Sequence, residues 1–102
     1  MRLWGVNPRT MCRQHLLGEH VEMHMVAGSV RRGRPLGRLL DGFVDLARVR
    51  RRHRELAVEM KRRGYCHKSP LLPMGHVRGG RIDVQENAVE LQRRCRACRR
   101  LK

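Results

Sequence analysis

The sequence predicts an all-α protein that forms a single compact domain of about three helices. A chain of 102 residues is long enough for one modest hydrophobic core. Aromatic residues make up only 3% of the chain, so the core must consist of Leu, Val, Met and Ala. This mixture favours packed helices over a sheet. Apolar residues also recur at helical spacing in three stretches, which predicts where the helices lie.

The first predicted helix covers residues 11–32, with Thr10 available as its N-cap. Gly33 and Pro35 are expected to end it. The second predicted helix covers residues 36–63, because apolar side chains continue at helical spacing through this stretch, and Gly64 is a suitable stop.

Residues 66–82 contain two prolines and three glycines and are expected to form a loop. The third predicted helix covers residues 83–100. Asp83 and Glu86 form a variant of the capping box at its start. Its apolar stripe ends in Cys95 and Cys98. The whole chain, 1–102, is thus expected to be one helical domain.

The charge of the chain points to a polyanionic partner. It has 24 Lys and Arg against 9 Asp and Glu, a formal net charge of +15 and a pI near 11.6. Nucleic acid is the first choice, because neutralising phosphates releases counterions without any need for sequence recognition. A solvated face is the plainer alternative, although like charges one helical turn apart repel. The candidate DNA-binding residues are Arg31, Arg32, Arg48, Arg50, Arg51, Arg52, Arg54, Lys61, Arg62 and Arg63.

Three chemically active side chains lie on one face of the first predicted helix. His15, Glu19 and Glu22 are spaced at i, i+4 and i+7. We expect the chain to begin with the α-amine of Met1, a group with an ordinary pKa of about 7.7–8.0 that is partly neutral and nucleophilic near neutral pH. Such an amine can form an imine with a sugar C1′, and a carboxylate such as Glu22 can move the protons. Alternatively, both glutamates pair with arginines on a solvated face.

The order of these residues resembles that of the phage pyrimidine-dimer DNA glycosylases, the endonuclease V family. The shared features are Gln14-His15-Leu16 followed by Glu19 and Glu22, and a basic segment that runs into Gly64 and Tyr65. The resemblance extends over roughly the first two thirds of the chain. The chain departs from the family at Val21 and Met25, where arginines flank the glutamate in the best-known member, and it lacks the aromatic C-terminal tail.

The resemblance implies a compact helical enzyme that excises a damaged base and then cleaves the backbone. By position, Met1 would supply the amine and Glu22 the catalytic carboxylate. Arg2 and His15 would make neighbouring contacts to DNA or to the active site. The expected reaction is DNA glycosylase with abasic-site lyase activity, through an imine at the α-amine and β-elimination.

The four cysteines leave a metal site open. Cys66, His67, Cys95 and Cys98 would form an acceptable tetrahedral zinc set. Buried core cysteines on the apolar stripe are the alternative that we favour, so no cofactor is expected. His20 and His24 also have a metal-ligand spacing, but their sequence neighbours supply no third ligand.

The expected partner is double-stranded DNA, damaged or modified, bound by a monomer. No membrane segment or leader is predicted, which favours the cytoplasm, that of the bacterial host if the gene belongs to a phage. Two rival functions remain: a non-catalytic basic DNA-binding protein on the same scaffold, and a zinc-stabilised nucleic-acid adaptor. The sequence does not specify which lesion is excised.

Overall fold

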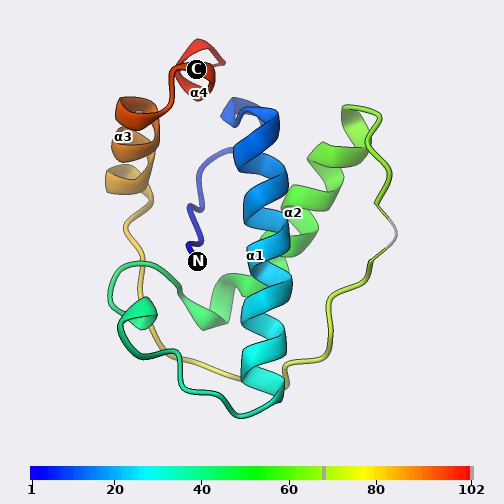
Figure 1. The fold of residues 1–102 in the computed structure, drawn as a ribbon, viewed down its shortest axis with the longest axis vertical. Coiled ribbons are helices and arrows are strands. Elements are labelled where there is room, and N and C mark those ends of the chain that lie inside the picture. Colours follow the sequence, from blue (N-terminus) through cyan, green and yellow to red (C-terminus); the bar gives the residue numbers. More distant parts are fainter. Residues whose placement is uncertain (68, 102) are drawn as a thin grey trace.

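The computed structural model describes residues 1–67 and 69–101, and this part of the chain is mostly helical (Figure 1). It has four α-helices: α1 (Arg13–Arg31), α2 (Val49–Arg62), α3 (Val84–Arg94) and α4 (Arg96–Arg100). Short 3-10 turns lie at Pro8–Thr10, Gly37–Leu40 and Leu46–Arg48. Within the described residues there is no β-strand, only two isolated β-bridges. The prediction of an all-α fold is confirmed.

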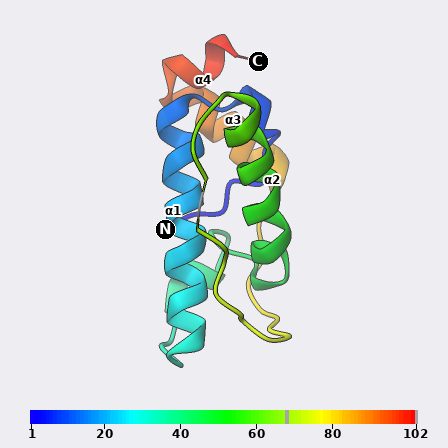
Figure 2. The ribbon, with the colours of Figure 1, turned by 90° about the vertical axis from the view of Figure 1, so that its right-hand side faces the viewer.

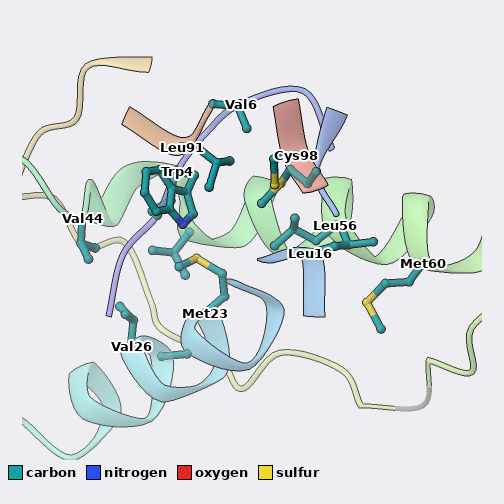
Figure 3. Packing of buried hydrophobic residues seen from close by; sticks show 14 of the residues in the cluster. Trp4, Val6, Leu16, Met23, Val26, Val44, Leu56, Met60, Leu91 and Cys98 are labelled. Carbon is teal, nitrogen blue, oxygen red and sulfur yellow. The ribbon is translucent and has the colours of Figure 1, made fainter. Parts of the chain in front are cut away.

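The core lies between α1, α2 and the segment that precedes α1 (Figure 3). Leu16, Met23 and Val26 project from one face of α1 and are fully buried. Leu56 and Met60 of α2 pack in the same cluster. Aliphatic and Met side chains thus fill the interior, as the shortage of aromatic residues predicts.

The first residues of the chain are irregular, and they run through the interior of the protein. In Figures 1 and 2 the N-terminus lies beside the middle of α1. Leu3, Trp4 and Val6 are buried. The amide of Leu3 donates to the carbonyl of Phe43 (2.8 Å), which fixes this extended segment against the connection between α1 and α2.

About half of the predicted second helix, 36–63, is an α-helix in the structure. Helix α2 begins only at Val49, and residues 36–48 form two 3-10 turns joined by a tight turn at Gly42 and Phe43. Gly37 and Gly42 adopt left-handed conformations (φ +54° and +91°), which a continuous right-handed helix excludes. The apolar side chains of this stretch cover the N-terminal segment instead of forming a helical stripe.

The predicted third helix, 83–100, is interrupted. Asp83 caps α3 as expected, accepting from the amide of Glu86 (3.0 Å). Cys95 is extended (φ −124°, ψ 108°) and separates α3 from α4. The first helix departs less from its prediction, since it starts at Arg13 with Cys12, and not Thr10, in the N-cap position.

The described part of the predicted loop 66–82 contains no helix. The end of this loop pairs with the connection between α1 and α2 through the two β-bridges, Asp41 with Arg81 and Asp45 with Gly80. Gly80 is required there, because its φ is +77° and a Cβ atom would lie 2.0 Å from the carbonyl oxygen of Val44. Among the described residues, no helix is long and apolar enough to cross a membrane.

Candidate active site

The start of the chain contacts Glu22 directly. The backbone amide of Arg2 donates to Oε2 of Glu22 at 3.1 Å. Glu22 lies in the middle of α1, and Met1 packs against the edge of the core. Met1 is therefore covalently next to a group held by the carboxylate of Glu22. A reaction that used both residues would require such proximity.

The side chain of Arg2 fixes the orientation of this terminus. Its Nη2 donates to Oδ1 of Asn87 on α3 at 2.8 Å. Its Cζ lies 4.1 Å from the centre of the Trp4 ring and 5.2 Å from that of Phe43, within the range of cation–π attraction. Burial lowers the pKa of Arg2, and the charge of Arg94 lowers it further. Arg2 is thus partly buried and positions the chain, besides any contact with DNA.

Two surface hollows border the terminus, and exposed Phe43 lines both. The first hollow is mainly apolar and is lined by Met1, Leu36, Arg38, Leu39 and Phe43. The second is polar, and the residues that line it are Arg2, Asp41, Gly42, Phe43, Arg81, Ile82, Asp83, Glu86, Asn87 and Glu90. Both open beside the first two residues of the chain, so a group bound in either one would lie near the terminus.

Glu19 and Glu22 share a face of α1 but have different roles. Glu19 is 1% exposed and forms two bonds with Arg52, at 2.5 Å to Nε and 3.0 Å to Nη2. Arg52 also donates to the carbonyl of Val6 (2.7 Å). The prediction that Arg52 contacts DNA is therefore corrected, since its side chain is 3% exposed and joins α1, α2 and the N-terminal segment.

The other candidate DNA-binding residues differ in how they are held. Arg63 is mostly buried and donates to the carbonyls of Pro8 and Met11, so it too supports the N-terminal segment. Three exposed arginines pair with acidic neighbours, namely Arg48, Arg51 and Arg62. Arg50 donates to the carbonyl of Gly75. Five of these candidates are exposed and have no ion pair among the described residues, namely Arg31, Arg32, Arg50, Arg54 and Lys61.

His15 lies in a cluster of thiols beside Trp4. Its Nδ1 is 3.2 Å from Sγ of Cys12 and 3.6 Å from Sγ of Cys98, and its ring meets that of Trp4 edge to face. Burial lowers the pKa of His15, and the charge of Arg94 lowers it further. Cys95 completes the group, with its Sγ 3.8 Å from that of Cys12.

The zinc set that the sequence left open as an alternative, Cys66, His67, Cys95 and Cys98, is not assembled. Cys66 is exposed, and His67 belongs to a different group from Cys95 and Cys98. Cys95 and Cys98, the pair that the sequence singled out, lie close together, but the side chains grouped with them are Cys12 and His15 at the start of α1. A Cys-x-x-His spacing was the signal that would have found them.

Four histidines form a second cluster, between α1, α2 and the loop that follows. Nε2 of His67 lies 2.8 Å from that of His20, and Nε2 of His53 lies 3.2 Å from that of His24. Burial lowers the pKa of His20 to about 4, and the other three imidazoles contribute. Burial also lowers the pKa values of His24 and His53. The sequence indicated the pair on α1 but not the two ligand candidates from elsewhere.

The fold and site together define a class: a small, basic, helical protein whose first residues are held against a glutamate on a helix. The chain belongs to the pyrimidine dimer DNA glycosylase family, whose model matches residues 1–73. Membership implies DNA glycosylase activity on pyrimidine dimers, with DNA as the substrate. Neither the search of curated proteins nor that of solved structures gave a match. The matched range includes α1 and α2, whereas α3 and α4 follow it.

Proposed function

We propose that this protein is a DNA glycosylase with abasic-site lyase activity that acts through an imine at the α-amine of Met1. Glu22 is the carboxylate that moves protons in the reaction. The observation that carries the proposal is the 3.1 Å hydrogen bond from the amide of Arg2 to Glu22. It supports a role for both groups because it brings the first residue of the chain to the one carboxylate that the resemblance singles out.

The chemistry follows from the properties of an amine and a carboxylate. The nitrogen lone pair of Met1 attacks C1′, and the base leaves with the electrons of the glycosidic bond. Opening of the sugar ring at C1′–O4′, with a proton supplied to O4′, gives the imine. Loss of a proton from C2′ then expels the 3′ phosphate. Glu22 is suited to both proton transfers because it lies within one residue of the nitrogen.

The nucleotide must leave the base stack before C1′ is accessible. The two hollows beside Met1 and Arg2 offer space for an extruded base, and the ring of Phe43 on their shared rim is 42% exposed. An aromatic face stacks on a nucleobase without regard to its identity. We therefore assign Phe43 a stacking role. The exposed residues Arg54 and Lys61 of α2 contact phosphates without reading sequence.

The first test is borohydride trapping with protein whose N-terminus is free. Three duplexes are compared: one irradiated with ultraviolet light, one abasic and one undamaged. We expect a covalent adduct on the irradiated and the abasic duplexes, with mass spectrometry placing it on Met1. Protein that is acetylated at the terminus, or extended by one residue, should lose the adduct and keep salt-sensitive binding.

The carboxylate is tested with Glu22→Gln, which keeps the shape of the side chain but removes its charge. We expect this variant to fold, to bind DNA and to lose strand scission. Glu55→Gln on α2 is the matched control, because its carboxylate pairs with arginines at the surface. Normal scission by Glu22→Gln would exclude the proposed role of this residue. DNA binding without an adduct on any of the three duplexes would instead favour the non-catalytic DNA-binding protein.

A further inference from the structure

We propose that Cys12, His15, Cys95 and Cys98 bind a zinc ion that joins α4 to the start of α1. This site is separate from the proposed catalytic pair and does not depend on the proposed function. The four ligand atoms come from two parts of the chain that are at least eighty residues apart. In both ribbon views α4 lies next to the beginning of α1 (Figures 1 and 2).

The distances between the ligand atoms fit one tetrahedral ion. Zn–S bonds of about 2.3 Å and Zn–N bonds of about 2.0–2.1 Å place two sulfurs roughly 3.8 Å apart, and a sulfur and a nitrogen roughly 3.6 Å apart. The sulfurs of Cys12 and Cys95 are 3.8 Å apart, and the sulfur of Cys98 is 3.6 Å from Nδ1 of His15. The sulfur of Cys12 lies somewhat closer to that nitrogen, at 3.2 Å.

The local backbone also suits metal-bound thiolates. Both pairs have the ligand spacing of a zinc knuckle, Cys-x-x-His at residues 12–15 and Cys-x-x-Cys at 95–98. The amide of Cys12 donates to Sγ of Cys98 (3.2 Å), and the amide of Cys98 donates to Sγ of Cys95 (3.4 Å). Such bonds to sulfur stabilise the deprotonated ligands and fix their direction.

The interruption between α3 and α4 has a physical reason in this site. The predicted continuous helix would carry Cys95 and Cys98 along one stripe, whereas the extended backbone at Cys95 lets its sulfur cap the amide of Cys98 and approach Cys12. Among their described residues, α3 and α4 bury only Asn87, Leu91 and Cys98. So small an apolar contact needs another link, and a structural metal supplies one in small domains.

The experiment measures metal in the untagged protein after incubation with Zn²⁺ and extensive dialysis. We expect bound zinc that falls by about one equivalent per chain in Cys95→Ser. The exposed Cys66→Ser is the matched control and should keep the full amount. Co²⁺ in place of Zn²⁺ should give the charge-transfer absorption of thiolate ligands, and His15→Cys should retain and strengthen that absorption.

A second measurement keeps the proposal testable if Cys95→Ser does not fold. In the native protein, three of the four thiols should resist a thiol reagent until a chelator removes the metal, while Cys66 reacts at once. A Co²⁺ complex without thiolate absorption would overturn the proposal. So would four thiols that react equally with and without chelator, which is the behaviour of a hydrogen-bonded thiol cluster.

An independent observation indicates a second metal site, formed by His20, His24, His53 and His67. The four ligand nitrogens lie within 4.8 Å of one another. Tetrahedral Zn–N bonds of about 2.0–2.1 Å would place neighbouring nitrogens roughly 3.3 Å apart. The two shortest N–N distances here, 2.8 Å and 3.2 Å, are both a little shorter than that. Imidazole ligands suit Zn²⁺ and neighbouring transition-metal ions, and we infer that this cluster takes such an ion.

This second site is tested with His67→Gln, because His67 lies in a loop where the substitution disturbs packing least. We expect zinc content to fall by about one equivalent relative to wild type, with the cobalt–thiolate absorption unchanged. His76→Gln, which changes an exposed histidine outside the cluster, should have no effect. Equal zinc content in His67→Gln and wild type would overturn the site and leave two N–H···N hydrogen bonds as the explanation of the cluster.

Discussion

Two parts of this protein, residues 1–67 and the helices α3 and α4, are stabilised by different kinds of interaction. The first part has the interlocking apolar core of α1 and α2, with the buried ion pair of Glu19 and Arg52 beside it. The second part contributes few buried side chains and is attached by polar and sulfur contacts. One of these is Asn87, which donates to the carbonyls of Leu3 and Trp4.

The comparison indicates how the proposed catalytic pair is positioned. Glu22 is fixed by the first part, because it lies on α1. The terminus that it contacts is held from both sides, by Phe43 of the first part and by Asn87 of the second. Disturbing the first part should therefore unfold the protein, whereas disturbing the second should misplace the terminus and leave most of the fold intact.

The largest expected effect is from breaking the buried ion pair of the first part. Arg52→Met leaves the carboxylate of Glu19 buried without a partner, and we expect a loss of about 3–5 kcal/mol in the free energy of unfolding. Chemical denaturation measures it. Arg51→Ala is the control, since Arg51 is 86% exposed and its pair with Glu55 is worth about 0–1 kcal/mol. A loss below that of the control would contradict the importance given to the buried pair.

A smaller effect is expected from Asn87→Ala in the second part. It removes the donors to the carbonyls of Leu3 and Trp4 and the acceptor for Arg2, at a cost of about 1–3 kcal/mol. We expect reduced imine trapping with DNA affinity maintained, because the terminus loses its position. Gln85→Ala, an exposed change on the same helix, is the control. Unchanged trapping would show that the second part does not position the terminus.

Acid should lower the stability of the first part because it protonates the carboxylate of Glu59. Hydrogen bonds from Arg62 and Arg63 hold its pKa down at about 2, against an ordinary value of 4.5. Because the folded-state pKa is lower than the unfolded one, the stabilisation is present above about pH 4.5 and is lost as the pH falls towards about 2. We expect about 1–2 kcal/mol, since Arg62 is half exposed to solvent. Melting temperatures of wild type and Glu59→Gln between these pH values should converge on acidification, and a constant difference would contradict the assignment.

The smallest effect on stability is expected at the exposed basic surface. Arg54→Ala and Lys61→Ala should each change the free energy of unfolding by at most about 0.5 kcal/mol. Each should reduce the slope of log affinity for DNA against log salt by about one. Arg93→Ala on α3, whose side chain pairs with Glu90, is the control and should leave the slope unchanged. An equal decrease in the control would mean that DNA contacts both parts alike.

The sequence predicted the helices that follow simple periodicity and missed the features that depend on distant contacts. The apolar spacing of α1 and the cap at Asp83 are local signals, and both are correct. The break at Cys95 depends on a neighbour, Cys12, that no local pattern contains. Residues 36–48 have helical spacing but instead cover the N-terminal segment, a tertiary contact that overrides propensity.

Of the candidate site, as of the helices, the sequence predicted some features and missed others. Glu22 was singled out from the sequence, and its carboxylate accepts a hydrogen bond from the amide of Arg2, while its catalytic role stays a prediction. The role of Arg52 was wrong because charge density alone cannot distinguish an exposed arginine from one that meets a buried glutamate. The histidine cluster was missed because its members come from three separate segments of the chain, which no local pattern connects.

The contacts of the first residues impose an order on biosynthesis. The side chain that holds the carbonyls of Leu3 and Trp4, Asn87, is translated more than eighty residues after them. Until Asn87 is made, the terminus has its hydrogen bonds to Glu22 and Phe43 but lacks the contacts from α3. Contacts between residues so far apart in the sequence form late in folding. The last contacts that position the first residues therefore form only after α3 has been made, and a chain that stops before Asn87 lacks them.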